Sequence, residues 1–442
     1  MNATHRIPSF AITAALACTS SLLAQASWQI AYPAQSPLPD YQWSAAFDEA
    51  RGEGLIRKGN VGWRWNGSTW TQMTGPGPNL GTGSVMVYDV MRQCVVLWGN
   101  VAGFPPGNTQ LWEWNGATWQ QRLVAMPPFP GSVGYAYDRA RGVTVVFGGT
   151  TTNDDTWEWN GVAWTHPLPA VRPPAREQSA MAFDPITQRC LLYGGFGANQ
   201  VKLVDTWTWN GSSWQQQFPA SPPFSRDQAT MVVDVDRARV VLQGGSLYDF
   251  QTWEWDGAQW HHSNPNSPGA WQWMTGFYDT VRRETVLHGG THPYVGNTNY
   301  TWRYSTPSAA TAIAFGAGCA GSAGTPVLAK APYTLPWLGD TMRTRVTTVP
   351  AGLGALFVSS FTPATPTSLT PFGMPGCNLL VTAEALEFRS ANAGAAEWTL
   401  SIPNNTALVG MPIHQQALPL DPTANALGVV ASNGLVMVPG IR

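Results

Sequence analysis

The chain has 442 residues, and only 11% of them are charged, against about 25% in an average soluble protein. Its formal charge of −2 at pH 7 excludes the general basic character that nucleic acids or an anionic membrane surface select for, so neither partner is expected. The 45 glycines and 36 prolines favour many short strands joined by turns over long helices, and the length predicts two domains.

The first residues have the features of an export signal. An apolar stretch from Ile7 to Leu23 is followed by Ala-Gln-Ala at 24–26, the small-x-small form of a signal-peptidase site. We expect residues 1–26 to be removed by cleavage near Ala26 and the protein to be secreted or held at the cell surface, in an extracellular or periplasmic setting. A spanning helix is disfavoured because the stretch is short and rich in Ser and Thr, and lipid attachment at Cys18 ranks lower.

A tryptophan motif recurs through the following 280 residues. Its form is Trp-x-Trp-Asn/Asp-Gly-x-x-Trp, and successive copies start 49, 45, 50, 46 and 49 residues apart, a spacing typical of stacked structural repeats. Upstream of each copy lies an aliphatic run ending in Gly-Gly or Gly-Asn, and before that an aromatic residue or Val followed by Asp. The copies start at Trp63, Trp112, Trp157, Trp207, Trp253 and, truncated, Trp302; the aspartates are Asp48, Asp89, Asp138, Asp184, Asp234 and Asp279.

Each unit is expected to form four short strands, for example 179–184, 189–195, 205–210 and 212–216 in the fourth. The Asn-Gly or Asp-Gly pair between strands three and four predicts a type I′ hairpin turn with two positive φ angles. The period of two then places both Trp residues of strand three on one face of the sheet. Sheets with flat aromatic faces are stable only when stacked on neighbours, so the prediction is an all-β fold with a six-bladed β-propeller over 27–306.

The two ends of this ring are expected to join. The sixth unit lacks the Gly-x-x-Trp part of the motif, whereas Ser27-Trp28-Gln29 matches Thr118-Trp119-Gln120 of the second unit. The N-terminal strand is therefore expected to supply the missing outer strand of the sixth blade. Deletion of residues 27–33 is expected to lower thermal stability strongly.

Paired glycines, an aromatic strand and a lone Trp together resemble kelch repeats, over residues 27 to about 306. The departures are a shorter turn between strands three and four and a second Trp in strand three. The resemblance implies a propeller and a habit of binding. It implies no single activity, because similar repeats are found in galactose oxidase and in many adaptor proteins.

The loops from strand two to three and from strand four to the next strand one share one end of such a propeller, where function is usually placed. The loops from strand two to three are long in alternate units, at Asn100–Gln110, Phe196–Val204 and Thr291–Tyr300. Three raised loops that frame a shared depression are one interpretation. Duplication of repeats in pairs, without functional meaning, is an equally weighted alternative.

The same end is expected to carry five candidate ligand-binding residues. Aromatic and arginine side chains are the types that dominate binding hot spots. The alternative is structural, because Arg before strand one often forms an ion pair and Trp in a propeller is usually core. The candidates are Arg176, Arg226, Trp271, His292 and Tyr294.

No catalytic, metal-binding or cofactor-binding residues are assigned. Galactose oxidase chemistry needs a Tyr-linked cysteine beside copper, yet Cys94 and Cys190 fall within strands, where we expect them to be buried. Sialidase chemistry is disfavoured because its Asp-x-Gly turn is absent from the repeat. Neighbouring strand residues point to opposite faces, so His261 and His262 are not expected to chelate one ion.

Residues 311–442 lack the tryptophan repeat and hold only ten charged side chains. Alternating segments such as 341–349 and 355–361 predict a small β-sandwich. Cys319 and Cys377 are expected to form a disulfide, because an exported protein can oxidise them. The pattern Phe315-Gly-Ala-Gly-Cys319, with Pro-Gly-Cys at 375–377, resembles a C-terminal domain of large secreted bacterial proteins. That resemblance implies export, with surface attachment as one role.

The expected function is therefore that of a monomeric, non-enzymatic extracellular binding or adhesion protein, whose propeller loops contact a glycan or a protein. The alternative is a carbohydrate-active hydrolase or oxidase with its site at the centre of the propeller face. Such an enzyme would place two carboxylates, or an acid and a His, across the central depression.

Overall fold

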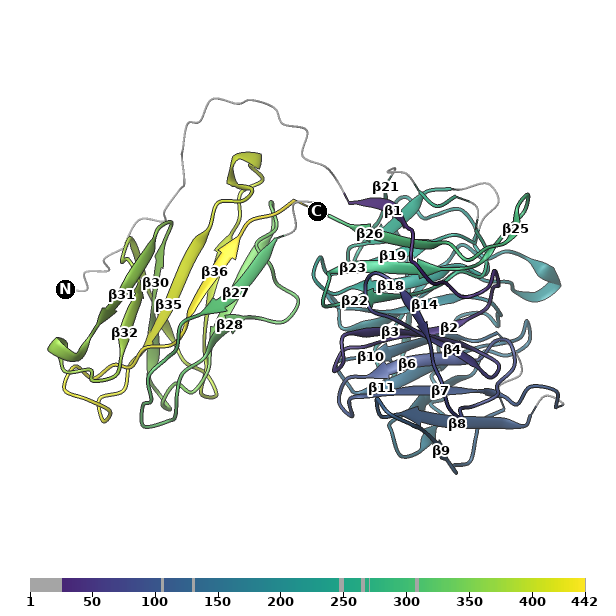
Figure 1. Cartoon of the computed structure of the whole chain (residues 1–442), viewed down its shortest axis with the longest axis horizontal. Coiled ribbons are helices and arrows are strands. Elements are labelled where there is room, and N and C mark those ends of the chain that lie inside the picture. The colour runs from purple at the N-terminus through teal and green to yellow at the C-terminus, as the bar shows by residue number, and fades with distance from the viewer. Residues whose placement is uncertain are drawn as a thin grey trace. The chain divides into compact units, whose positions relative to one another are not determined.

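The computed structural model describes residues 26–104, 107–128, 132–245, 250–263, 267–269, 271–306 and 310–441 (Figure 1). The expected signal peptide, with Cys18, lies outside the described residues except for Ala26. The described residues form two compact units: residues 26–306 with Lys330–Leu335 make one, and the remaining residues between 310 and 441 make the other. Within the described ranges, no helix is long and apolar enough to cross a membrane.

Six four-stranded antiparallel sheets make up the described part of the first unit. Sheet 1 holds β2 (Ser44–Asp48), β3 (Glu53–Lys58), β4 (Val61–Trp65) and β5 (Trp70–Gln72); sheet 2 holds β6 (Val85–Asp89), β7 (Cys94–Asn100), β8 (Thr109–Trp114) and β9 (Trp119–Arg122); sheet 3 holds β10 (Gly134–Asp138), β11 (Val143–Phe147), β12 (Thr156–Trp159) and β13 (Trp164–Thr165). Sheet 4 holds β14 (Ala180–Asp184), β15 (Arg189–Tyr193), β16 (Thr206–Trp209) and β17 (Trp214–Gln217); sheet 5 holds β18 (Thr230–Asp234), β19 (Arg239–Gln243), β20 (Thr252–Trp255) and β21 (Trp260–Ser263); sheet 6 holds β22 (Thr275–Asp279), β23 (Glu284–His288), β26 (Thr301–Ser305) and β1 (Ser27–Ala31).

The first strands of the six sheets contact one another in cyclic order. β2 contacts β6, β6 contacts β10, and the series continues through β14, β18 and β22 back to β2. Sheets arranged around an axis in this way form a β-propeller, in which each blade covers the face of its neighbour. The predictions of an all-β chain and of a propeller are therefore confirmed.

The turn between strands three and four differs from the prediction. In sheet 3, Asn160 and Gly161 open a four-residue loop that closes at the pair Trp159 and Trp164. Only Gly161 has a positive φ, of 90°, so the expected type I′ turn was wrong. The reason is that Asn160 Oδ1 accepts hydrogen bonds from the backbone N–H groups two and three residues later, both at 2.9 Å, which stabilises the loop while the Asn backbone stays outside the left-handed region.

Tryptophan side chains fill the interfaces between the sheets, as expected. Trp207, Trp209 and Trp214 of sheet 4 share a core with Val145 and Phe147 of sheet 3. The buried indole N–H groups need acceptors, and threonines at the start of the preceding sheet's third strand supply them. The Nε1–Oγ1 distances are 2.9 Å for Trp70 to Thr301, 2.9 Å for Trp214 to Thr156 and 3.1 Å for Trp260 to Thr206.

β1 takes the position of the fourth strand in sheet 6. It pairs antiparallel with β26, and Trp28 lies opposite Tyr304. Trp28 is 2% exposed and donates to Thr252 Oγ1 of sheet 5 at 2.7 Å, the same kind of bond that Trp70, Trp214 and Trp260 make. The first residues described in the unit are thus packed as an ordinary part of the last sheet.

In the turn between the first and second strands of a sheet, the repeated aspartate binds the arginine three residues later. Asp138 is fully buried and accepts from the Arg141 backbone N–H and from Arg141 Nε at 2.7 Å. The same guanidinium binds Glu158 and lies against the turn glycine of sheet 4, where a Cβ on Gly211 would come within 2.7 Å of it. The Asp-x-x-Arg pair therefore stabilises its own turn and contacts the next sheet.

The second unit contains two larger sheets with a shared core. The first has the order β27 (Thr311–Phe315), β36 (Gly434–Val438), β35 (Ile413–Pro419), β30 (Gly354–Ser360), β33 (Ala385–Ser390); the second has the order β28 (Leu328–Lys330), β29 (Thr341–Val346), β34 (Ala396–Ser401); a pair is formed by β31 (Pro363–Ser368) and β32 (Asn378–Val381). Met342 and Trp398 of the second sheet pack with Phe357 and Leu435 of the first.

The cysteines lie where the sequence predicted them. Cys319 and Cys377 form a disulfide with a Cα–Cα distance of 5.1 Å, and they pack in a small core with Met374. Cys94 and Cys190 are free and buried. Burial raises the pKa of the Cys94 thiol to about 11, so this cysteine is a packing residue and no nucleophile.

Replacement of Trp28 by Ala is expected to lower the free energy of unfolding by about 3–5 kcal/mol, because a fully packed indole and its hydrogen bond to Thr252 are lost. Thermal and urea unfolding followed by circular dichroism measure the change. Tyr32→Ala is the control, since Tyr32 lies just past β1 and is 86% exposed. Equal stability of the two variants would contradict the role of β1.

Acid should destabilise the propeller through His288. This side chain is buried in β23, with Nδ1 3.0 Å from Thr301 Oγ1, and burial lowers its pKa to about 3. Below pH 6.5 His288 is protonated in the unfolded chain but stays neutral in the folded protein. The free energy of unfolding therefore falls by about 1.4 kcal/mol per pH unit as the pH decreases to about 3. Urea unfolding of His288→Gln between pH 7.5 and 4.5 should show a shallower slope, whereas the exposed control His262→Gln should keep the parent slope.

Candidate binding face of the propeller

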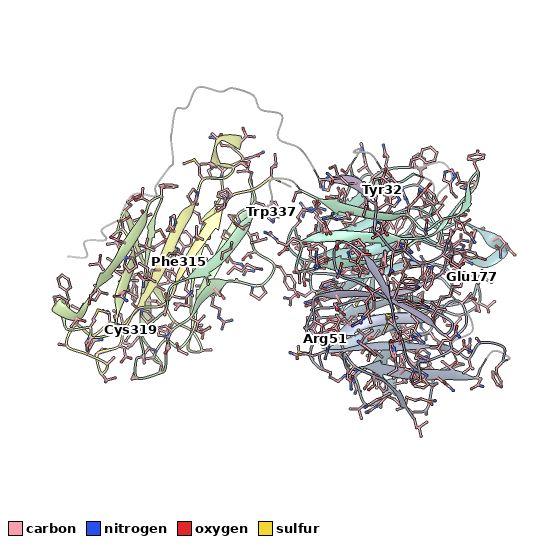
Figure 2. The ribbon with its side chains drawn as sticks, in the orientation of Figure 1. Tyr32, Arg51, Glu177, Phe315, Cys319 and Trp337 are labelled. Atoms are coloured by element: carbon pink, nitrogen blue, oxygen red, sulfur yellow. A yellow bond between two sulfur atoms is a disulfide. The ribbon has the colours of Figure 1, made fainter. Side chains whose placement is uncertain are left out.

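The connections from strand two to three and from strand four to the next strand one share one end of the propeller, which we call the loop face. Figure 2 shows Glu177, which precedes β14, at the end opposite Arg51, which belongs to the turn after β2. β25 (Gly296–Asn297) projects at the same end as Glu177 (Figure 1). All five candidate residues belong to segments of this face.

The three long loops of the loop face are attached to the rest of their sheets in the same way. Each forms a β-bridge with the segment that precedes the first strand of its own sheet: Val101 with Leu80 in sheet 2, Phe196 with Glu177 in sheet 4 and Thr291 with Gln272 in sheet 6. In sheet 4 the loop includes the short 3-10 helix η1 (Ala198–Gln200), and in sheet 6 it forms the hairpin of β24 (Thr291–His292) and β25. The alternation read from loop lengths thus corresponds to three similar raised structures.

Arg176 is a buried structural contact of the loop face. It is 0% exposed, and its guanidinium donates to both carboxylate oxygens of Asp205 at 2.7 Å and to the Gly194 carbonyl at 3.0 Å. Burial alone would raise the pKa of Asp205, but the hydrogen bonds and charge of Arg176 hold it below its ordinary value. These contacts fix the residue that precedes β16, the third strand of sheet 4, and they leave no part of the guanidinium exposed to a ligand.

Arg226 occupies the equivalent place in sheet 5. It is 1% exposed and donates to the backbone carbonyls of Gly244 at 2.6 Å and Gln251 at 2.9 Å. Its neighbour Asp227 pairs with Lys202 of the raised loop of sheet 4, with an Nζ–Oδ1 distance of 2.6 Å. Both candidate arginines therefore hold loops in place, and their role as ligand contacts stays a prediction.

Trp271, His292 and Tyr294 come together as an aromatic cluster. The His292 ring lies 4.9 Å from Trp271 and 5.7 Å from Tyr294, and Tyr300 stacks on Trp271 edge-on at 5.8 Å. Trp271 is the buried base of the cluster, with Nε1 bonded to the Pro268 carbonyl, while Tyr294 is 93% exposed. The exposed ring is held at the tip of a hairpin with its aromatic face available to a partner.

A second feature of this face was not predicted. Six residues, each six positions before a repeated aspartate, encircle the mouth of the central channel; we call them the mouth belt. Four consecutive backbone bonds connect five of them, from Gln42 N to Trp273 O, Trp273 N to Gln228 O, Gln228 N to Gln178 O and Gln178 N to Ser132 O, at 2.8–3.3 Å. The belt consists of Gln42, Gly83, Ser132, Gln178, Gln228 and Trp273. The glutamines at one common offset were the signal that could have revealed it.

Four carboxylates of this face contact a basic side chain. Asp205 binds Arg176 and Asp227 binds Lys202, while Asp40 lies 2.6 Å from Lys58 and Asp155 lies 3.1 Å from His166. No group of three His, Cys, Asp or Glu side chains that could hold a metal occurs in the described ranges. These acids are engaged in positioning loops and do not face each other as a catalytic pair.

The central channel holds a cavity of about 170 Å³, which is lined by the six first strands, including Phe47, Phe183 and Phe277. Glu49 and Arg139, from the non-adjacent sheets 1 and 3, also line it and form a two-bond ion pair at 2.5 and 3.0 Å. All five candidate residues lie at the loop face, which is therefore the candidate binding surface.

Comparison with known proteins adds two structural likenesses. No protein family model matches the chain, and no curated protein matches it. The solved structure of YjhT is 11% identical with a TM-score of 0.47, covering 61% of this chain and 95% of that one. YCF48 from Cyanidioschyzon merolae is 13% identical with a TM-score of 0.35, covering 63% of this chain and 98% of that one.

Replacement of Arg176 by Met should lower the free energy of unfolding by about 3 kcal/mol, because Asp205 then loses a buried bidentate partner. Urea unfolding measures the loss, and the double variant Arg176→Met with Asp205→Asn should recover part of it. Arg172→Met is the control: its partner Asp154 is 47% exposed, and such a pair contributes at most about 1 kcal/mol. A parent-like stability of the Arg176→Met protein would contradict the stabilising role of this pair.

Proposed function

We propose that this protein is a secreted or cell-surface binding protein that contacts an extracellular glycan or protein through the loop face of its propeller. In this proposal the propeller is six-bladed and of kelch type, spans 27–306 and is closed by its N-terminal strand. A C-terminal β-sandwich over 311–442 serves as a spacer or attachment unit. The protein works as a monomer.

The aromatic cluster carries the proposal. A hairpin presents Tyr294 almost fully exposed, with its ring 5.7 Å from His292, and His292 in turn packs against the buried Trp271. An exposed large apolar side chain has no folding reason to be fixed in this way, whereas a rigid aromatic anchor is the usual centre of a binding surface. The raised loops of sheets 2 and 4 add the exposed side chains of Phe104 and Val201.

One further observation favours export over residence in a reducing compartment. The disulfide between Cys319 and Cys377 is typical of proteins that fold in an oxidising environment.

A glycan array probed with the full chain, followed by a hydrolysis assay on each hit, tests the proposal. Tyr294→Ala and His292→Ala should each weaken binding of a hit by about tenfold or more, since a central aromatic anchor contributes 2 kcal/mol or more. Val162→Ala is the matched control, because Val162 is 74% exposed at the opposite end, in the turn after β12.

Turnover of a bound glycan would replace the binding proposal by the enzymatic one. Equal loss of binding in Tyr294→Ala and Val162→Ala would place the contact surface elsewhere.

A further inference from the structure

The mouth belt is interrupted at sheet 2. Within the described residues, no backbone hydrogen bond joins Gly83 to either of its neighbours, Ser132 and Gln42. The segment before β6 bonds its own hairpin instead: Gly81 N donates to Asn100 O at 2.7 Å, and Ala102 N donates to Asn79 O at 3.0 Å. The bridging residue Leu80 lies nine positions before its aspartate, against seven for Glu177 and Gln272, so extra chain length draws this segment away from the belt.

A cavity of about 220 Å³ lies at this interruption. Gln42, Gly83 and Ser132 of the belt line it, together with Thr82, Asn100 and the ring of Trp98. This volume is below the roughly 300–1,000 Å³ of pockets that hold drug-sized ligands. The cavity therefore has room for one compact group at a time.

The polar groups of the cavity are uncharged and available. The side chains of Gln42, Thr82 and Ser132 have no hydrogen-bond partner in the part of the chain that the structure describes. Asn100 is oriented, because its Oδ1 accepts from the Gly107 N–H and the Thr109 hydroxyl. Its Nδ2 group donates no hydrogen bond to any residue that the structure describes, so it is free to bind a ligand in the cavity.

This set of groups matches a sugar ring. Amides and hydroxyls both donate and accept hydrogen bonds, as sugar hydroxyls do. An ionised ligand would lose its hydration without gaining a counter-charge, since none of the lining residues is charged. A neutral ring is therefore favoured over a uronic or sialic acid.

We propose that the interruption of the mouth belt at Gly83 is a subsite for one neutral sugar ring, so that the ligand of the loop face is a neutral glycan. This inference rests on the proposed function and adds its ligand class. The belt explains why the subsite occurs at sheet 2 and not at sheets 4 and 5. In sheets 4 and 5 the side-chain amide of Gln228 donates to Gln178 Oε1 at 2.8 Å, and these two side chains fill the space that Gly83 leaves open in sheet 2.

Gly83 is the residue that keeps the subsite open. Three of the six belt positions hold Gln with φ of 57–62°, so this backbone conformation accepts a glutamine. A Cβ on Gly83, whose φ is 77°, would meet only Ser132 Oγ at 3.9 Å and would point into the cavity. Gly83→Gln therefore repeats a side chain that the belt already carries and fills the space.

The test uses the full chain and saturation-transfer NMR with methyl glycosides of glucose, galactose, mannose and N-acetylglucosamine, with glucuronic acid as the charged probe. At least one neutral glycoside should bind, glucuronic acid should not, and Gly83→Gln should weaken the binding by about tenfold or more. Gln228→Gly is the matched control, since Gln228 belongs to sheet 5, opposite sheet 2 in the ring, and bonds no residue of the cavity, so the variant should keep parent affinity. Thermal unfolding of each variant checks that it is folded.

Thr82→Val and Ser132→Ala provide a second route if Gly83→Gln does not fold. Each removes one hydroxyl with little change of shape and should weaken binding about 3- to 10-fold, the equivalent of one hydrogen bond. Binding that survives all three variants but is lost in Tyr294→Ala would overturn the subsite and leave the proposed function standing. Selective binding of glucuronic acid would overturn the neutral class. The absence of any ligand on the glycan array would overturn the sugar subsite and leave a protein as the partner in the proposed function.

Discussion

Burial of tryptophan between neighbouring sheets is the constraint on which this propeller depends. Each full repeat places three indoles against the preceding sheet, and a buried indole N–H needs an acceptor there. A threonine at the start of the third strand supplies it in four interfaces, including the one that Trp28 completes with Thr252. The sixth repeat has no fourth strand and no fourth-strand tryptophan of its own. Segment 27–31, from the other end of the repeat region, supplies both.

The two ends of the propeller have divided their roles. At one end the buried aspartates, their arginines and the turn glycines of the next sheet make a repeated set of contacts, exemplified by Asp138, Arg141 and Gly211. At the loop face the backbone bonds of the mouth belt position the first strands, while the loops above them vary in length. The loops vary in length at this end while the core stays the same, which is the physical reason to seek the binding surface there.

The loop face also shows how one repeat acquires a property that the others lack. In sheet 2, extra residues before β6 let the segment bond its own hairpin, and the belt then loses its contacts at Gly83. The result is a cavity that is lined only by uncharged residues. The aromatic cluster of sheet 6 arises by another route, an extended hairpin that presents Tyr294. Both features modify a repeat without changing its core.

Local periodicity determined much of this protein. The tryptophan spacing predicted sheets of four strands in a propeller, and compartment chemistry predicted the pair Cys319–Cys377, because strand alternation and thiol oxidation depend on nearby sequence or on the environment. Tertiary structure decided the rest. Arg176 lies 29 residues from the Asp205 that binds it, Asn160 bonds its own loop in place of a type I′ turn, and the belt joins residues from five sheets. Which residues become partners depends on their distances in the folded ring, and these distances cannot be read from the spacing of residues along the chain.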